Sequence, residues 1–158
     1  IYQFKETFQL NFITGKLDQV GLDDLVKDIG NIIKRMKINV VYTPFINDVH
    51  TDHKYVSKAV IACTKWFRNS SIRKILMYET VSETNFNFLN DKSFKPNLYM
   101  DISIFLEKKI KIAKVYNSEI KTHPFPRSAE SIRSLAILRG SESGFKYAEA
   151  FMLVYERL

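Results

Sequence analysis

The sequence predicts an α/β protein with an open, mostly parallel sheet and helices on its faces. Two features predict this class. Strand-like and helix-like segments alternate along the chain, which is the pattern of right-handed crossovers between parallel strands. The segment 38–43 is rich in β-branched residues and stops at Pro44, as a strand buried on both faces does. With 158 residues, 46% of them hydrophobic, the chain is long enough for a single α/β domain over residues 1–158.

Periodicity predicts the first elements of the chain. Apolar and polar residues alternate over residues 8–13, which predicts a strand that ends at Gly15. Apolar residues recur at helical spacing over residues 22–36, with acids in the first turn and bases in the last. Charges placed in this way interact favourably with the helix dipole, so we expect a helix there. The strand over 38–43 and a polar loop come next.

The middle of the chain predicts a helix, a strand and a long loop. The helix begins with Thr51 as its N-cap and keeps an apolar side as far as Phe67. Residues 73–79 predict the next strand. The polar and aromatic stretch over residues 80–95 is too irregular for one element, so we expect a long functional loop.

The last third of the chain predicts two helices and a closing strand. Residues 101–116 have an apolar side at helical spacing, and a short helix is expected over 129–138. Gly140 and Gly144 then predict a turn, and residues 147–155 predict the final strand.

Composition and charge narrow the classes of function. An aromatic content of 13% and few glycines and prolines exclude a disordered or low-complexity chain. The net charge is +7, but the basic residues are scattered singly over polar helix faces, so we do not expect nucleic acid as a partner. No segment has the uninterrupted apolar length of a membrane span. Cys63 is the single cysteine, which favours a cytoplasmic protein without disulfides.

The residues with the clearest chemistry follow the strand over 38–43. Residues 47–53 read Asn-Asp-Val-His-Thr-Asp-His, at the edge where open α/β sheets bind ligands. His53 would lie in the first turn of a helix, whose dipole disfavours imidazolium, so it suits a metal ion. His50 would face a substrate, with Asp52 orienting it or raising its basicity. The alternative is that these are capping and surface residues of an ordinary loop.

Further motifs follow this loop in order. They are His50-Thr51-Asp52-His53, then Tyr78-Glu79-Thr80-Val81-Ser82-Glu83-Thr84, then Pro96 to Ile102 with Lys109 and Ala113, and finally Pro126-Arg127-Ser128, Arg139-Gly140 and Tyr147 to Phe151. From about residue 38 to residue 156 the sequence thereby resembles the LmbE-like (PIG-L type) N-acetylglucosaminyl deacetylase family. The resemblance implies a Rossmann-like, mostly parallel sheet with flanking helices.

The resemblance also implies a zinc-dependent hydrolase. In such enzymes a divalent metal, typically zinc, is held by a His and an Asp of a His-Pro-Asp-Asp motif and by the last His of His-x-Asp-His. By position, His53 would be a metal ligand, and His50, tuned by Asp52, would stabilise the oxyanion or protonate the leaving amine. The implied reaction is hydrolytic removal of an acetyl group from an N-acetylated amino sugar or sugar conjugate, with metal-bound water as nucleophile.

One motif of the family is absent from the sequence. No His-Pro-Asp-Asp occurs, since His123-Pro124 continues as Phe125-Pro126. A catalytic zinc needs about three protein ligands. We therefore expect the chain to be the C-terminal part of a deacetylase domain, truncated at its N-terminus, which alone is inactive and binds zinc weakly. The alternative is a non-catalytic sugar- or nucleotide-sugar-binding module that has lost its metal site.

Five further residues are candidates for substrate binding. Glu79, Ser82 and Thr84 follow a predicted strand and are placed to line a sugar pocket, although loop capping explains the Ser and Thr equally well. Arg127 and Arg139 suit an anionic group such as a diphosphate, with structural ion pairs as the alternative. The expected partner is a small amino-sugar molecule, and phosphorylated and nucleotide-linked forms are among the candidates. A homo-oligomer is compatible with the sequence, which does not fix the oligomeric state.

Overall fold

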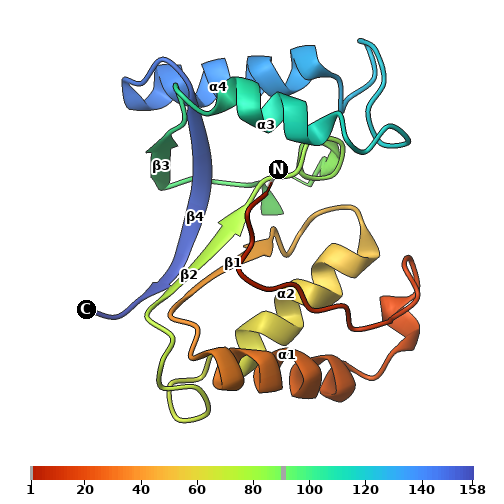
Figure 1. Ribbon diagram of the computed structural model, residues 1–158, viewed down its shortest axis with the longest axis vertical. Coiled ribbons are helices and arrows are strands. Elements are labelled where there is room, and N and C mark those ends of the chain that lie inside the picture. The colour runs from red at the N-terminus through yellow and green to blue at the C-terminus, as the bar shows by residue number, and fades with distance from the viewer. Residues whose placement is uncertain (1, 90–91) are drawn as a thin grey trace. The chain divides into compact units, whose positions relative to one another are not determined.

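The computed structural model describes residues 2–89 and 92–158 and has the α/β architecture that the sequence predicts (Figure 1). Four strands form a sheet in the order β1-β2-β4-β3. The chain divides into two compact units. The 9–96 unit comprises Gln9–Pro96 and Phe151–Leu158, and the 97–150 unit comprises Ile1–Phe8 and Asn97–Ala150. The expectation of a single domain over the whole chain stays a prediction.

The 9–96 unit contains the parallel part of the sheet. Its elements are η1 (Leu17–Gln19), α1 (Leu22–Met36), β1 (Val40–Pro44), α2 (Thr51–Cys63), β2 (Lys74–Tyr78), η2 (Thr84–Phe86) and the later part of β4 (Ala148–Glu156). Strands β1 and β2 are parallel, with Val40 opposite Lys74, and α2 is part of the crossover between them. Strand β4 runs antiparallel to β2, with Phe151 opposite Tyr78, so the sheet is mixed.

Two apolar clusters hold the helices of this unit in place. In one, Ile33 of α1 and Cys63 of α2 pack with Ile75 of β2 and with Ile72, which precedes that strand. Burial raises the pKa of the Cys63 thiol, which outweighs the opposing effect of the charge on Arg68. A thiol in this setting stays protonated, so Cys63 is a core residue, as free cysteines usually are, rather than a nucleophile.

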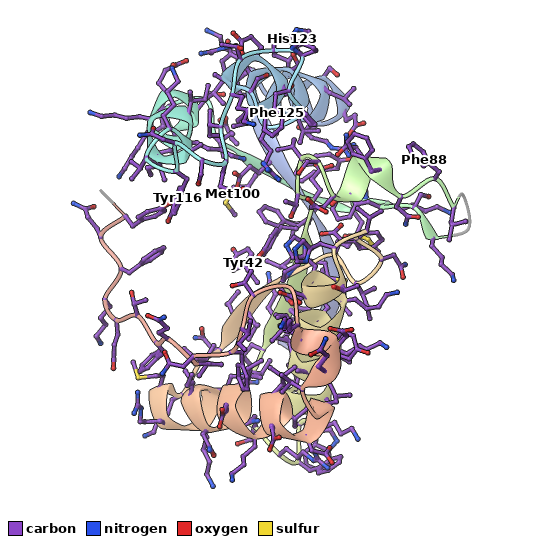
Figure 2. The ribbon with its side chains drawn as sticks, turned by 90° about the vertical axis from the view of Figure 1, so that its right-hand side faces the viewer. Tyr42, Phe88, Met100, Tyr116, His123 and Phe125 are labelled. Atoms are coloured by element: carbon purple, nitrogen blue, oxygen red, sulfur yellow. The ribbon has the colours of Figure 1, made fainter. Side chains whose placement is uncertain are left out.

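The 97–150 unit is built on two helices. Its elements are β3 (Leu98–Asp101), α3 (Leu106–Ala113), α4 (Ala129–Ser143) and the start of β4. Helix α4 begins at the N-cap Ser128, whose hydroxyl accepts a hydrogen bond from the Ser131 N–H, and ends at Gly144 in the left-handed conformation. Glu107 of α3 and Arg133 of α4 form an ion pair of 2.6 Å. His123 lies in the connection between these helices (Figure 2).

The strand predicted over residues 8–13 is wrong. The segment forms no ladder, and Asn11 has a φ of 57°, in the left-handed region. The alternation nevertheless corresponds to burial, because Phe12 packs against the apolar cluster of Leu17, Leu25 and Ala59. A period of two therefore indicated which side chains face the helices, although the backbone has no partner strand there.

The helix predicted over residues 101–116 is wrong at its start. Strand β3 ends at Asp101, and α3 begins only at Leu106. The Asp101 carboxylate accepts hydrogen bonds from the Ser103 N–H and hydroxyl, which forms a local turn and lowers the pKa of Asp101. Gly140, expected in a turn, lies inside α4. Within the described residues, no helix is both long enough and apolar enough to cross a membrane.

Candidate functional site

The connection from β1 to α2 carries both histidines of the His-x-Asp-His motif. Strand β1 ends at Pro44 and α2 begins at Thr51, so the connection leaves from the carboxyl end of a strand. The N-cap of α2 is His50 and not, as predicted, Thr51. The Nδ1 atom of His50 accepts a hydrogen bond of 3.2 Å from the Asp52 N–H. The rings of His50 and His53 stack, with centroids 5.0 Å apart and planes at 29°.

His53 is oriented by Asp48, a residue for which no role was predicted. The Nδ1 atom of His53 lies 2.7 Å from Oδ2 of Asp48, whose side chain is fully buried, while the His53 side chain is 25% exposed. A carboxylate on one ring nitrogen is the usual support of a metal-ligating histidine, because it fixes the ring and leaves the other nitrogen for the metal. The sequence does show an aspartate, Asp48, five residues before His53, and this spacing could have suggested the contact.

The loop after β2 supports Asp48 in turn. The Thr84 hydroxyl donates a hydrogen bond of 2.6 Å to Oδ1 of Asp48, and the Thr80 N–H donates one of 2.8 Å to the Thr84 oxygen. Burial, and secondarily the negative charge of Asp48, raises the pKa of Tyr78. Both carboxylate oxygens of Asp48 thus have a protein donor, and the loops that follow two neighbouring strands are joined at this residue.

The Asp52 carboxylate does not hydrogen-bond to His50, contrary to the prediction that it orients this histidine. The Asp52 oxygens accept hydrogen bonds from the Gly15 N–H at 2.6 Å and the Leu17 N–H at 3.1 Å. The contact between Asp52 and His50 runs instead through the Asp52 backbone. Two N–H groups at the start of η1 need a buried acceptor, and the Asp52 carboxylate, at the start of α2, provides it. Asp52 therefore ties the chain around residues 15–17 to the histidine loop.

The residues proposed to line a sugar pocket have protein partners in the loop after β2. The Ser82 hydroxyl donates to Oε1 of Glu83 at 3.0 Å, and the Ser82 N–H donates to Oδ1 of Asn85 at 2.8 Å. Ser82 also has a φ of 79°. Glu79 directly follows β2 and is half-buried. Local hydrogen bonding accounts for these positions of Ser82 and Thr84, and a role of the three residues in substrate binding stays a prediction.

The two candidate arginines belong to the 97–150 unit and form ion pairs within it. The Nη1 atom of Arg139 lies 2.9 Å and 3.0 Å from the two carboxylate oxygens of Glu142, one turn further along α4. The Nη2 atom of Arg127 lies 3.1 Å from the Glu119 carboxylate, and the guanidinium lies over the ring of Phe125. The structural alternative offered for both is thus confirmed, and their binding of an anionic substrate group stays a prediction.

The residues present fit one ligand position of a zinc site. His53 has its Nδ1 on a buried carboxylate and its ring partly exposed, as a ligand through Nε2 requires. Over residues 2–89 and 92–158, no group of three His, Cys, Asp or Glu side chains is arranged to hold a metal ion. A three-ligand site would need two ligands in addition to His53.

Known proteins resemble the chain in sequence over its first part and in fold over nearly all of it. The structure of N,N'-diacetylchitobiose deacetylase from Pyrococcus horikoshii matches 96% of the chain, with a TM-score of 0.73 and 20% identity. The conserved protein TT1542 from Thermus thermophilus matches 93%, with a TM-score of 0.70 and 21% identity. GalB, the 4-carboxy-2-hydroxymuconate hydratase from Pseudomonas putida KT2440, matches 86%, with a TM-score of 0.63 and 15% identity.

These proteins are longer than the part that the chain matches. The chain spans 58% of the deacetylase, 64% of TT1542 and 60% of the hydratase. The family model described as GlcNAc-PI de-N-acetylase (PIG-L) matches residues 1–64, which include the histidine loop and all of α2. The match also takes in residues 1–37, which the sequence motifs had left out. Over residues 1–64 the chain therefore matches the model of the PIG-L type de-N-acetylase family, the family that its motifs resemble, and its fold is similar to that of a solved deacetylase.

Proposed function

We propose that this chain is part of an enzyme that removes the acetyl group from an N-acetylated amino sugar or sugar conjugate by hydrolysis. The observation that carries the proposal is the hydrogen bond between His53 and the buried Asp48, which prepares one ring nitrogen for a ligand. The family match over residues 1–64 includes both residues. The deacetylase among the similar structures supports the same class of reaction, since its substrate is an N-acetylated sugar by name.

We also propose zinc, or another divalent metal, as the cofactor. His53 would be the ligand from this chain, and the other ligands would come from a His-Pro-Asp-Asp motif outside these 158 residues. When bound, such a metal polarises the acetamide carbonyl and lowers the pKa of a bound water. The chain alone would then bind zinc weakly and be inactive.

The other candidate residues would position the substrate and stabilise the charge that develops on it during the reaction. His50, stacked on His53, is the proposed group that stabilises the oxyanion or protonates the leaving amine. Asp52 supports this role indirectly, since its backbone N–H holds the His50 ring and its carboxylate anchors the loop. Glu79, Ser82 and Thr84 are proposed to contact the sugar, and Arg127 and Arg139 a phosphate or nucleotide attached to it. A cytoplasmic location stays a prediction.

Similarity of fold alone does not decide the reaction. One of the similar structures is a hydratase, and a fold of this kind supports unrelated chemistry. The rival function is a sugar- or nucleotide-sugar-binding module without catalysis. The two functions differ in whether acetate is released, so one assay separates them.

The test uses the full-length natural protein with N-acetylglucosamine, N,N'-diacetylchitobiose and nucleotide-linked N-acetylglucosamine as substrates. We expect release of acetate that a chelator abolishes and zinc restores, and loss of nearly all activity in His53→Ala. His123→Ala is the matched control, because His123 is exposed in the 97–150 unit, and it should retain activity. Activity that survives His53→Ala would contradict the proposal, and sugar binding without acetate release would support the rival.

A further inference from the structure

The two stacked histidines differ in what their Nδ1 atoms contact. In His53, Nδ1 faces a carboxylate oxygen of Asp48, whereas in His50 it faces the backbone N–H of Asp52. An ionised carboxylate only accepts hydrogen bonds, and a backbone N–H only donates them. A neutral imidazole has one nitrogen that donates and one that accepts, so each contact determines which form of the ring fits.

The position of the proton on His53 follows from the contacts of Asp48. The Thr84 oxygen accepts from the Thr80 N–H, so its own hydrogen is directed to Oδ1 of Asp48. The other oxygen, Oδ2, is left to accept from His53 at 2.7 Å. The Asp48 side chain is fully buried, so bulk solvent does not reach these oxygens. The Nδ1 atom of His53 must therefore carry the proton, and Nε2 is left unprotonated, with its lone pair available.

The position of the proton on His50 follows from its place at the end of a helix. The first N–H groups of a helix have no partner within the helix, so an N-cap side chain supplies an acceptor. His50 fills this position, and its Nδ1 accepts from the Asp52 N–H at 3.2 Å. Nδ1 must then be without a proton, so a neutral His50 carries its proton on Nε2.

We infer that the loop holds the two imidazoles in opposite tautomers, with Asp48 as the positioning residue for His53 and the first turn of α2 as the positioning element for His50. His53 presents a lone pair and His50 presents an N–H donor, although they are two copies of one side chain stacked 5.0 Å apart. Their roles are not interchangeable, since each is fixed by a different contact with the protein.

What the tautomers accomplish rests on the proposed function. In a deacetylase, the lone pair of His53 would serve a cation, and the Nε2–H of His50 would donate a hydrogen bond to the developing oxyanion. The tautomers themselves rest only on the contacts of the loop. They can therefore be measured without any activity.

The test is nuclear magnetic resonance of the full-length, chelator-treated protein labelled with 15N at histidine, at a mildly alkaline pH where imidazole is neutral. Long-range correlations between ring protons and ring nitrogens identify which nitrogen carries the proton. His50→Gln and His53→Gln assign the signals, and the exposed His123 is an internal reference (Figure 2). We expect a protonated Nδ1 in His53 and a protonated Nε2 in His50. The same tautomer in both rings would overturn the inference.

Asp48→Ala tests the positioning role. We expect the His53 signals to shift from the Nδ1–H form toward a mixture, while the His50 signals stay unchanged. If His53 keeps the pure Nδ1–H form without Asp48, the positioning role is refuted. If this variant does not fold, the spectrum of the unmodified protein still decides between one tautomer and two. A protein with opposite tautomers and no deacetylase activity would refute only the proposed function, and an active protein with matching tautomers would refute only this inference.

Discussion

The 9–96 unit and the 97–150 unit hold their carboxylates in different ways. In the first, Asp48 and Asp52 are buried and accept hydrogen bonds from ring, hydroxyl and backbone donors. In the second, Glu119, Glu142 and Glu149 are partly or largely exposed and pair with Arg or Lys. A buried carboxylate depends on fixed protein donors because it has lost its water, whereas an exposed one remains solvated. The buried Asp48 and Asp52 thus fix the local geometry, whereas the partly exposed ion pairs add little stability, and this includes the Lys74–Glu156 pair of the 9–96 unit.

The buried carboxylates also join distant parts of the chain. Asp52 connects the start of α2 to residues 15–17, and Asp48 connects the loop before α2 to Thr84. The ion pair of Arg139 and Glu142, in contrast, links neighbouring turns of one helix. A substitution at Asp48 or Asp52 therefore loosens the tertiary structure around the histidines, while one at Glu142 acts locally.

The largest expected effect on stability is that of Asp52→Asn. The amide loses the charge and directs an N–H group at one of two backbone N–H donors, Gly15 or Leu17. We expect a loss of about 2–3 kcal/mol in the free energy of unfolding, the usual cost when a buried hydrogen bond to a charged group is broken. Denaturant unfolding measures it. The matched change in the other unit, Glu142→Gln, removes a partly exposed ion pair and should cost less than about 1 kcal/mol. Equal costs would contradict the comparison.

An effect of similar or smaller size is expected at the glycines inside the helices of the two units. A Cβ added to Gly140 in α4 would lie 2.6 Å from the Phe145 carbonyl oxygen and 2.9 Å from that of Lys146. Because both neighbours are backbone atoms, we expect Gly140→Ala to destabilise the protein by about 1–3 kcal/mol. At Gly30 in α1 the nearest atom would be the Cys63 sulfur at 3.6 Å, an ordinary contact.

Gly30→Ala is accordingly the control for this prediction. Alanine is the better helix former, so this change should stabilise the protein by about 0.5–1 kcal/mol. Thermal unfolding of both variants provides the measurement. Opposite signs are expected, and a stabilising Gly140→Ala would show that the close approach in the 97–150 unit is not restrictive.

Local patterns predicted much of the fold. The helical spacing over residues 22–36 matches α1, and the β-branched run before Pro44 matches β1 with a small shift. The alternation over residues 8–13 indicated the partly buried side chains but not the missing ladder, since a strand needs a partner that the sequence does not identify. Strand β3 was missed because its four residues merge with the apolar pattern of α3.

The candidate site was predicted in part. His50 and His53 were singled out by their position in the loop after a buried strand, where such folds bind ligands, together with the motifs that follow in the chain. The contacts that orient the rings depend on the folded chain: Asp48 could be seen beside the histidines but not aimed at one of them, and the acceptor role of Asp52 involves residues 35 and 37 positions away. Sequence reasoning therefore singled out the two candidate histidines and missed the side chains that support them.

The central claim is that the buried Asp48 prepares His53 to bind a cation. The zinc affinity of the full-length protein, measured by competition with a chelator for the natural protein and for Asp48→Asn, tests it most directly. Loss of the carboxylate behind a histidine ligand should weaken zinc binding by about 10–100-fold. Asp23→Asn, at an exposed acid of α1, should leave the affinity unchanged. A zinc affinity that is the same with and without the Asp48 carboxylate would contradict the claim.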